Sequence, residues 1–316
     1  MLNRAEEGCV MISMEIVFQQ ILVIFGYVLV GYVSGKVGLI NREQQRFLSK
    51  LISSLILPFT VLAASSMETR SEDLLNLGIS TVIMTTSFIL TTVCCQLYAK
   101  AKGLNEAQSA AYTGLCTYPN NAFVGMPLCI ALLGEWGTLY GAASMIAFNL
   151  PFFTYQVSLF TKKKFSIRSL MTPLNFSTIL LILMLVFHLR FPSPVQTVVS
   201  NIGGITTPLA LIIVVVMLAG SNLSEVFREK RAYIITLIRN LVCPLAVLVV
   251  LALLPLDPTM RLAVLIFVAC PVGNMTSVFA IQTDMEPQLC ARATLLSTLF
   301  FAGTIPFIIW LGQMVF

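Results

Sequence analysis

Ten apolar stretches, each long enough to cross a lipid bilayer, follow one another along this chain with only short polar connections. A spanning segment needs about 20 apolar residues, and because lipid offers no hydrogen bonds, the segment must pair its own backbone groups as a helix. Only 10% of the 316 residues are charged, and the mean hydropathy is +0.90. Soluble domains carry roughly 25% charged residues. The sequence therefore predicts an all-α polytopic membrane protein.

The predicted transmembrane helices are numbered one to ten in chain order, and they cover residues 16–34, 44–66, 74–98, 107–133, 138–160, 174–190, 196–219, 231–253, 260–282 and 288–313. A short tail, residues 1–15, precedes them, and the longest connection is the loop 161–173. The chain therefore divides into a first set of five helices, residues 16–160, and a second set, residues 174–316, with no soluble domain between them.

Basic residues are distributed unevenly between the two sides of the predicted membrane. The loops and helix ends that follow odd-numbered helices hold 15 of the 19 Lys and Arg residues, and the opposite side holds 4. Because basic loops stay in the cytoplasm, the loop 161–173 is predicted to be cytoplasmic and both termini extracytoplasmic, in the cell (inner) membrane. Topology therefore accounts for the net charge of +5, and the expected surroundings are the lipid bilayer rather than a nucleic acid.

Three pairs of prolines are separated by nearly the same distance along the chain: 150 residues for Pro58 and Pro208, 152 for Pro119 and Pro271, and 155 for Pro151 and Pro306. A constant offset indicates two copies of one five-helix unit. Since each copy has an odd number of spans, the copies enter the membrane from opposite sides. This arrangement is a 5+5 inverted repeat, which is typical of carriers with alternating access.

Two polar segments interrupt predicted helices 4 and 9 at corresponding places, Cys116–Pro127 (C-T-Y-P-N-N-A-F-V-G-M-P) and Ala269–Ser277 (A-C-P-V-G-N-M-T-S). Proline removes a backbone donor and crowds the preceding turn, which breaks a helix. Freed backbone groups are tolerated at membrane depth only inside protein or beside a wet cavity. The pattern predicts two broken crossover helices with a binding site where they meet.

The broken ends determine which ligands the predicted site favours. Helix N-termini attract carboxylates or phosphates, whereas unwound carbonyls and helix C-termini can hold a cation. The candidate substrate-binding residues are the amides and hydroxyls at this depth: Asn120, Asn121, Asn149, Asn274, Thr276, Ser277 and Thr60. The candidates that shape the backbone are Pro119, Gly125, Pro127, Pro271, Gly273, Pro58 and Pro208. An alternative role for the asparagines is to cap the breaks without touching a ligand.

Ionisable and catalytic side chains are scarce inside the predicted spans. All 14 Asp and Glu residues lie in tails, loops or span ends, so no carboxylate is placed for a proton relay at mid-membrane. Arg239 lies inside predicted helix 8, from where it can snorkel to the cytoplasmic surface or draw in an anion. The eight cysteines form no C-x-x-C pair, and His188 is the lone histidine. We therefore expect no enzyme, no metal site and no cofactor.

Several short motifs occur in a specific order along the whole chain: Gly26-Tyr27, Gly31-Tyr32, Gly35, Gly38-Leu39-Ile40, Leu57-Pro58, the two Pro/Asn/Gly breaks, and Asn149-Leu150-Pro151 through Tyr155. In this order the chain resembles the auxin efflux carrier family, the PIN-like membrane transporters, which include bacterial malate and malonate permeases. It lacks the long central cytoplasmic loop of the plant carriers and is therefore similar to a compact bacterial member.

The resemblance implies a transport function and two domains with different roles. Helices 1, 2, 6 and 7 would form a scaffold that makes a homodimer, and helices 3–5 and 8–10 a transport domain that moves as an elevator. The substrates would be small organic acid anions, such as dicarboxylates or auxin-like carboxylates. Their carboxylate would lie near the crossing, where Asn149 of helix 5 would contact the substrate.

Two other functions remain open at the level of sequence. One is a sodium-coupled organic anion symporter of the related bile-acid type, in which carbonyls with Asn and Thr side chains at the crossing hold sodium. The other is a membrane sensor that retains a carrier fold without transporting. Dependence of uptake on sodium separates the first from a sodium-independent carrier, and turnover itself excludes the second.

Overall fold

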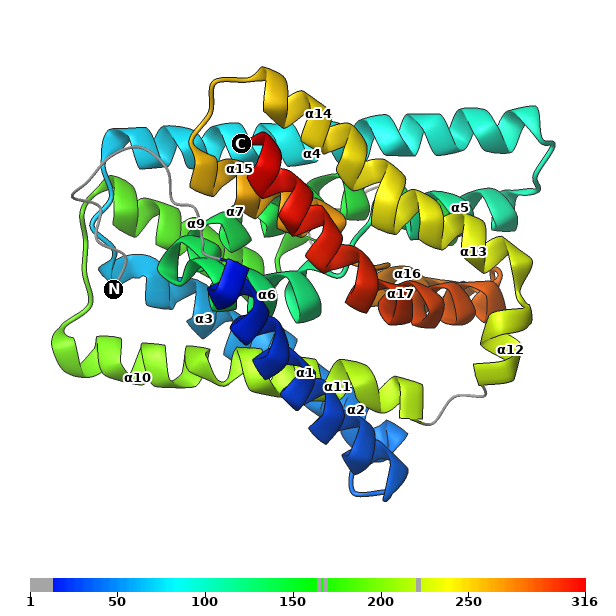
Figure 1. The fold of residues 1–316 in the computed structure, drawn as a ribbon, viewed down its shortest axis with the longest axis horizontal. Coiled ribbons are helices and arrows are strands. Elements are labelled where there is room, and N and C mark those ends of the chain that lie inside the picture. The colour runs from blue at the N-terminus through cyan, green and yellow to red at the C-terminus, as the bar shows by residue number, and fades with distance from the viewer. Residues whose placement is uncertain (1–13, 164–165, 167–169, 220–222) are drawn as a thin grey trace.

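A computed structural model describes residues 14–163, 166, 170–219 and 223–316, and Figure 1 shows its fold. Within these residues every regular element is a helix, apart from one isolated β-bridge between Pro119 and Val272. The all-α prediction is therefore confirmed. Most of the predicted tail 1–15, and residues 164–165 and 167–169 of the predicted loop, lie outside the described residues.

Short loops and π-helical turns (η) divide the chain into helices. Most of them overlap the ten predicted ranges, whereas α12, residues 223–228, lies in none of them. The first half comprises α1 (Met14–Lys36), α2 (Arg42–Leu51), η1 (Ile52–Ile56), α3 (Leu57–Ala63), the 3-10 turn η2 (Ala64–Ser66), α4 (Ser71–Ala101), α5 (Glu106–Thr117), η3 (Asn121–Gly125), α6 (Met126–Leu133), α7 (Glu135–Pro151), η4 (Phe152–Gln156) and α8 (Val157–Thr161). The second half comprises α9 (Pro173–Val186), α10 (Ser193–Gly204), α11 (Thr206–Ala219), α12 (Leu223–Arg228), α13 (Lys230–Leu237), η6 (Ile238–Val242), α14 (Cys243–Leu253), α15 (Pro258–Ala269), α16 (Asn274–Thr283) and α17 (Pro287–Val315).

Predicted helix 6 is shorter than the sequence suggested. It ends at Val186 instead of residue 190, because the chain turns at His188, whose φ is +52°. By length and composition, five continuous helices in the described chain can cross a membrane: 43–66, 71–101, 193–216, 230–253 and 287–315. Shorter apolar helices cover 22–36, 121–133, 173–186 and 258–269, and two of these are halves of the interrupted helices.

A π-helical turn precedes a proline at three places in the long helices. Three π-helical turns, η1, η3 and η6, each end two residues before a proline, namely Pro58, Pro127 and Pro244. Proline lacks the N–H that continues the ordinary ladder, and its ring crowds an earlier carbonyl, so the preceding turn widens. Pro208 lies at the start of α11, just after the junction at Ile205. The helices 43–66, 121–133, 193–216 and 230–253 therefore continue past these prolines.

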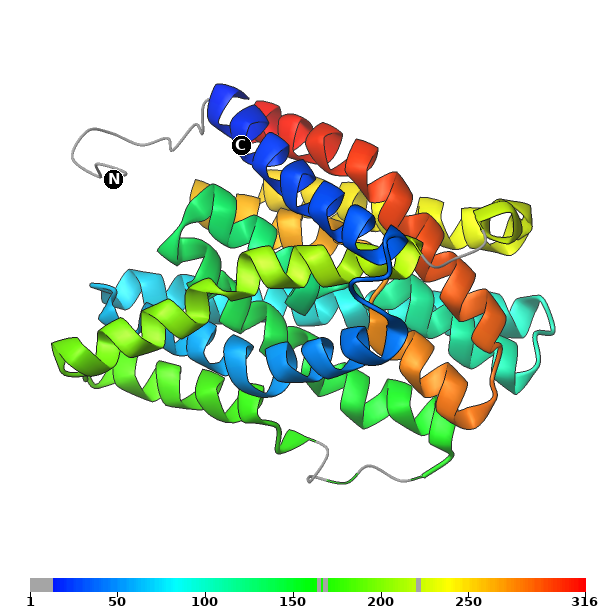
Figure 2. The ribbon, with the colours of Figure 1, turned by 90° about the horizontal axis from the view of Figure 1, so that it is seen from below.

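One group of helices is held together by close backbone approaches. α1 crosses α11 on one side of the molecule (Figures 1 and 2), where a Cβ added to Gly31 would lie 2.3 Å from the carbonyl oxygen of Ile212. α3 packs on α9 and α10, and a Cβ on Gly203 would lie 2.9 Å from the Cα of Thr60. The members of this group correspond to predicted helices 1, 2, 6 and 7.

A second group of helices has α15 at its centre, in contact with α4, α6, α7, α14 and α17. α4 contacts α5, α7 and α15, while α17 contacts α13, α15 and α16. Nine of the twelve residues of α15 are buried, although the helix is almost wholly apolar and would otherwise suit a lipid-facing position. Because α15 is surrounded on all sides by other helices, it fixes the position of the chain break that follows it.

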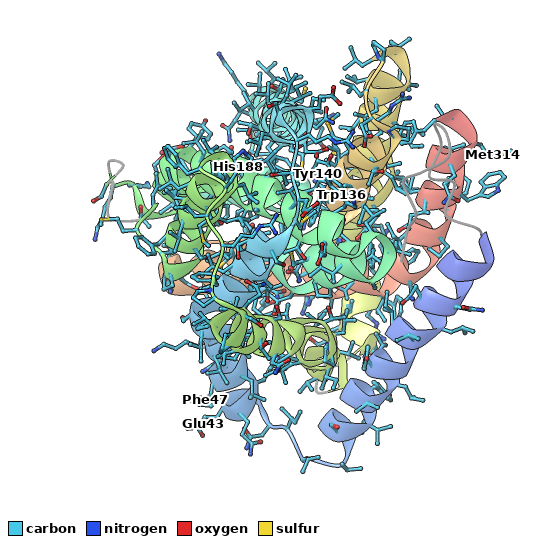
Figure 3. The ribbon with its side chains drawn as sticks, turned by 90° about the vertical axis from the view of Figure 1, so that its left-hand side faces the viewer. Glu43, Phe47, Trp136, Tyr140, His188 and Met314 are labelled. Carbon is cyan, nitrogen blue, oxygen red and sulfur yellow. The ribbon has the colours of Figure 1, made fainter. Side chains whose placement is uncertain are left out.

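The outer faces of the bundle are apolar. Figure 3 shows Phe47 on α2 and Met314 on α17 at opposite edges of the molecule, and their exposed fractions are 65% and 68%. Many other large apolar side chains on outer helix faces are also exposed. A soluble protein rarely exposes apolar surface on this scale, and a lipid environment removes the cost. The surface therefore agrees with the low charge of the sequence.

Candidate functional site at the crossing of two interrupted helices

The two predicted interruptions meet and pair with each other. α5 ends at Thr117 and α15 ends at Ala269, and each is followed by a few residues that are not helical. These residues run antiparallel through the bridge between Pro119 and Val272. Backbone groups that a broken helix would leave unpaired at membrane depth are thereby satisfied within the protein.

Two backbone hydrogen bonds hold the pair. Asn120 N donates to Pro271 O at 2.8 Å, and Gly273 N donates to Tyr118 O at 2.9 Å. A Cβ on Gly273 would lie only 2.8 Å from Pro119 O, so this position requires glycine. Pro271 and Pro119 lie within the pair, where neither needs to donate a hydrogen bond. The prolines and the glycine therefore lie where the two breaks pair.

Gly125 and Pro127 shape the helix that follows the first break. A Cβ on Gly125 would lie 2.8 Å from Phe267 Cδ1 and 2.9 Å from Cys270 Sγ, so η3 packs directly on α15. Pro127 lies in the first turn of α6, where a missing N–H is tolerated. The first break is thus built against the end of the second interrupted helix.

Asn120 and Asn121 are both buried at the crossing but differ in their partners. The Oδ1 of Asn120 accepts a hydrogen bond from Phe123 N at 3.4 Å, which caps η3, while its Nδ2 has no partner. Asn121 is 2% exposed, and neither its Oδ1 nor its Nδ2 has a partner. A buried amide without hydrogen bonds costs about 1–3 kcal/mol per group. Asn121 therefore has the donor and the acceptor free for a ligand.

Thr276 lies in a second polar cluster near the start of α16. It is buried and its Oγ1 has no partner. A Cβ on Gly114 would lie 2.5 Å from Thr276 Cγ2 and 2.8 Å from Gln156 Nε2, so these three residues are neighbours. Gln156 donates to Ala110 O at 2.8 Å, and its Oε1 is unpaired. Gln156 is not among the residues predicted from the sequence, although a glutamine inside an apolar span is a visible signal.

The other candidates on the second break have different surroundings. Asn274, the first residue of α16, is half-buried, and no side-chain hydrogen bond of this residue occurs within the described part of the chain. Ser277 is buried, and its hydroxyl pairs with the hydroxyl of Thr294 on α17 at 3.0 Å. Asn274 is therefore available to a ligand, whereas Ser277 already contributes to helix packing.

Asn149 and Thr60 bond to partners outside the two breaks. The Nδ2 of Asn149 on α7 donates to the Oδ1 of Asn175 on α9. The hydroxyl of Thr60 on α3 lies 3.0 Å from Gly203 O and 2.5 Å from the hydroxyl of Thr206. Each of these contacts joins a pair of helices. The structure thus places Asn120, Asn121 and Asn274 on the two breaks and Thr276 in the cluster with Gln156. Asn149 and Thr60 instead bond to neighbouring helices.

A small hydrogen-bond network joins the second break to η6 and α17. Val272 N donates to the Oγ of Ser297 at 3.0 Å, and that hydroxyl donates to the Oδ1 of Asn240 at 2.7 Å. The Nδ2 of Asn240 donates back to Ser297 O at 2.9 Å. Asn240 and Ser297 are buried on η6 and α17 and lie far apart in the sequence. Sequence reasoning missed both residues, because only the tertiary fold brings them to the break.

Arg239 is the clearest correction to the sequence analysis. Instead of snorkelling to the surface, its side chain is 1% exposed and ends at the crossing. The guanidinium donates to the carbonyls of Cys116, Thr117, Val268 and Cys270, at the ends of α5 and α15. The chain break supplies acceptors that an intact helix would keep for itself, and snorkelling is then unnecessary.

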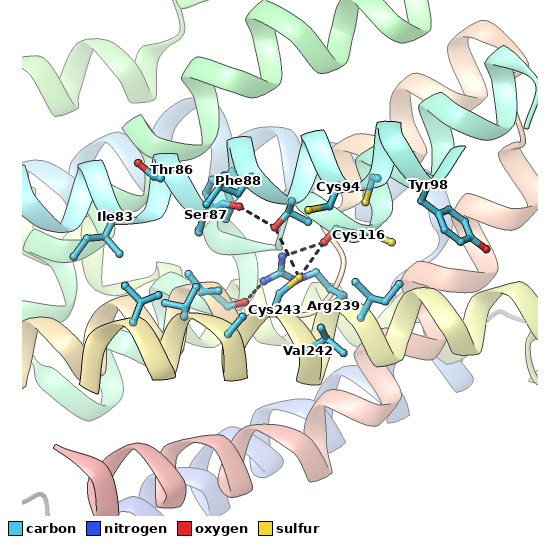
Figure 4. Close-up of a pocket in the computed structure, with 18 of the residues that line it drawn as sticks. Ile83, Thr86, Ser87, Phe88, Cys94, Tyr98, Cys116, Arg239, Val242 and Cys243 are labelled. Carbon is cyan, nitrogen blue, oxygen red and sulfur yellow. Dashed lines mark hydrogen bonds between the residues drawn. The ribbon is translucent and has the colours of Figure 1, made fainter. Parts of the chain in front are cut away.

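Two cavities flank α4 beside the crossing. One, of about 590 Å³, is an apolar groove between α4 and η6–α14 with Arg239 and Cys116 at its floor (Figure 4). The other, of about 670 Å³, runs between α4 and the end of α7 and reaches Tyr118. Asn121 lines neither of these two cavities. Among the described residues, no three His, Cys, Asp or Glu side chains are grouped as metal ligands.

Charged residues gather where α13 and α17 begin. Arg231 pairs with Glu229 at 3.0 Å and with Glu286 at 3.2 Å, and Arg292 pairs with Glu225 at 3.0 Å. The hydrogen bond from Arg231 holds the pKa of the Glu229 carboxyl below its ordinary value. This network ties the start of one long helix to the start of another at the surface.

Comparison with known proteins agrees with the geometry. The family model described as membrane transport protein matches residues 16–164 and 157–309, which together cover nearly the whole chain. No curated protein matches the chain at a significant level. The match and the apolar helices indicate a multi-pass membrane protein, in a family whose members are typically not enzymes. The chain belongs to the membrane transport protein family, the family of the auxin efflux carriers.

Proposed function

We propose that this protein is a secondary carrier of small organic acid anions, such as dicarboxylates, which works by elevator-type alternating access. The observation that carries the proposal is the buried, unpartnered amide of Asn121 at the start of η3–α6, on the break that pairs with the break before α16. Helix N-termini present free N–H groups and a positive partial charge, which favour a carboxylate. Asn121, Asn274 and Thr276 would contact the substrate, and Asn120 would assist them.

The proposed architecture is a ten-helix, 5+5 inverted repeat with both termini extracytoplasmic. α5 and α15 support it, because each is 12 residues long, each precedes a break, and each lies at the 152-residue offset of Pro119 and Pro271. The antiparallel pairing of the two breaks is what a two-fold relation in the membrane plane would produce. In this proposal residues 16–160 and 174–316 are the two repeats.

Access to the site requires movement, because Asn121 is buried and lines neither cavity beside α4. We assign the movement to the group around α15 (predicted helices 3–5 and 8–10), sliding against predicted helices 1, 2, 6 and 7, which would form the scaffold of a homodimer. Thr60 lies within that scaffold. Asn149, paired with Asn175 across α7 and α9, would lie at the boundary between the two groups.

The test is exchange in proteoliposomes. Purified protein is reconstituted into vesicles preloaded with a panel of unlabelled organic acids, and uptake of labelled malate is followed with and without a sodium gradient. Exchange that depends on the internal acid and is indifferent to sodium supports the proposal. Uptake that requires sodium favours the symporter alternative. Folded protein that exchanges no acid overturns the proposal and favours another substrate or a sensor.

A further inference from the structure

Arg239 occupies an unusual place for a charged residue. It lies in η6, near the middle of the continuous helix 230–253, and is 1% exposed. An ionised side chain at membrane depth is costly unless polar partners compensate its charge. In the part of the chain that the structure describes, Arg239 forms no ion pair with a carboxylate. Its compensation must therefore come from neutral groups.

Those groups are the carbonyls at the ends of both interrupted helices. Nη1 donates to Thr117 O at 2.9 Å and to Cys116 O at 3.3 Å, at the end of α5. Nε donates to Cys270 O at 3.2 Å, and Nη2 donates to Val268 O, at the end of α15. A helix C-terminus carries about half a negative charge. The guanidinium thus lies between two negative helix ends, in a cage of four carbonyl oxygens.

We propose that Arg239 is the resident cation of the crossing, filling the carbonyl cage that a bound sodium ion would otherwise neutralise. Unwound carbonyls and helix C-termini are the ligands that coupled carriers offer to sodium. Here a covalently attached charge saturates them, so the carrier needs no dissolved cation to assemble its site. The inference rests on the proposed function and deepens it, because it makes exchange independent of sodium and potassium.

The geometry also gives Arg239 a positioning role for the substrate site. By bonding to the ends of α5 and α15 together, it fixes the angle between the two breaks. The N-termini that would receive the carboxylate begin only a few residues further along each chain segment, at Asn121 and Asn274. Loss of the guanidinium would leave two negative helix ends facing each other beside an anionic substrate.

The experiment compares Arg239→Ala, Arg239→Lys and Arg239→Met in exchange and in thermal unfolding of the detergent-solubilised protein. Arg239→Ala leaves the cage empty, and the adjoining groove of about 590 Å³ provides a route to it. We expect exchange by Arg239→Ala to fall by about 10- to 100-fold, the loss expected for hydrogen bonds of a charged group. Millimolar guanidinium or sodium should raise the Tm of this variant and restore part of its exchange. Neither ion should alter the wild type.

The other two variants decide the question even if the alanine variant does not fold. Lysine keeps the charge and methionine does not, so Arg239→Lys should have the higher Tm and the faster exchange. Equal behaviour of the two, or a folded Arg239→Ala that responds to neither ion, would show a merely structural arginine. A wild-type protein that sodium stabilises would also overturn the proposal. Arg231→Ala, at the exposed network, is the control and should not respond.

Exchange and thermal stability test the carrier function and the role of Arg239 separately. If the wild-type protein exchanges none of the acids, the proposed function fails, but the thermal response of Arg239→Ala to guanidinium still reports on the cage. If exchange is present and the thermal response is absent, the carrier function stands and the resident-cation proposal fails.

Discussion

The two interruptions follow helices of equal length but are held by different means. The first break caps itself, because Asn120 bonds to Phe123 N, and it leaves Asn121 buried without partners. The second break has no side-chain cap, and distant residues on η6 and α17 hold its backbone through Val272 N. The difference suggests that ligand recognition is concentrated in the first break, while the second is the better anchored element.

The largest expected effect comes from the contact between the breaks. Gly273→Ala would place a Cβ 2.8 Å from the backbone oxygen of Pro119, which cannot move without breaking the antiparallel pair. We expect loss of folded protein in size-exclusion chromatography after solubilisation. Gly125→Ala meets side chains of Phe267 and Cys270 instead, which can shift, and should remain folded with a lowered Tm.

The control is Gly303→Ala on α17, because an added Cβ there meets nothing within 4 Å. This variant should be as stable as the wild type or slightly more so, since alanine favours a helix. A Gly273→Ala protein with normal yield and Tm would contradict the close pairing of the two breaks.

Exchange measurements separate the amides of the two breaks. Asn121→Ala should weaken apparent substrate affinity by about 10- to 100-fold, since a buried hydrogen bond to a charged group contributes about 1.5–3 kcal/mol. Asn274→Ala should have a smaller effect, because Asn274 is only half-buried and water can replace it. The measurement is the concentration dependence of malate exchange, with Asn201→Ala on the exposed face of α10 as the control.

Two results would revise this assignment. An Asn121→Ala variant with unchanged affinity and a raised Tm would show that the amide is only an unpaired buried group. An Asn274 variant with the larger loss would place recognition mainly in the second break.

The anchoring of the second break predicts an effect on stability rather than on affinity. Ser297→Ala removes the acceptor of Val272 N and the donor to Asn240 Oδ1, which costs about 1–3 kcal/mol for an unpaired buried group. The Tm should fall, while the exchange affinity of the folded fraction stays near the wild-type value. The neighbouring Thr298→Ala loses only a bond to Thr294 O within its own helix and should have little effect. If Ser297→Ala and Thr298→Ala have the same Tm, Ser297 does not anchor the second break.

The smallest effect is expected at the charge network where α13 and α17 begin. The folded-state pKa of Glu229 is lowered by the hydrogen bond from Arg231, so its contribution to stability is present above the ordinary carboxyl pKa and is lost as the pH falls through the lowered value. Glu229→Gln should reduce the stability at pH 7 by at most about 1 kcal/mol. Thermal unfolding at pH 7 and at pH 4 tests this, since the difference from the wild type should shrink at pH 4.

Much of this molecule follows from local chemistry that is visible in the sequence. Apolar runs in a chain with 10% charged residues specify helices, and Pro-Asn and Pro-x-Gly specify where two of them break. The same pattern marked Asn121 as a candidate for binding and Gly273 as a candidate for shaping the backbone, because both follow a proline inside an apolar span. The family resemblance, too, depended on short motifs in order and was confirmed.

The tertiary structure decided which distant groups meet. Arg239, Asn240 and Ser297 are ordinary neighbours of apolar residues in the sequence, and only the packing of η6 and α17 on the breaks gives them partners. The same packing directs Asn149 to Asn175 instead of to the crossing. The sequence thus determined where the backbone of this protein must open, since proline acts within one turn. Only the fold decided that Arg239 binds the carbonyls freed at the first break, since these contacts join residues more than a hundred positions apart in the sequence.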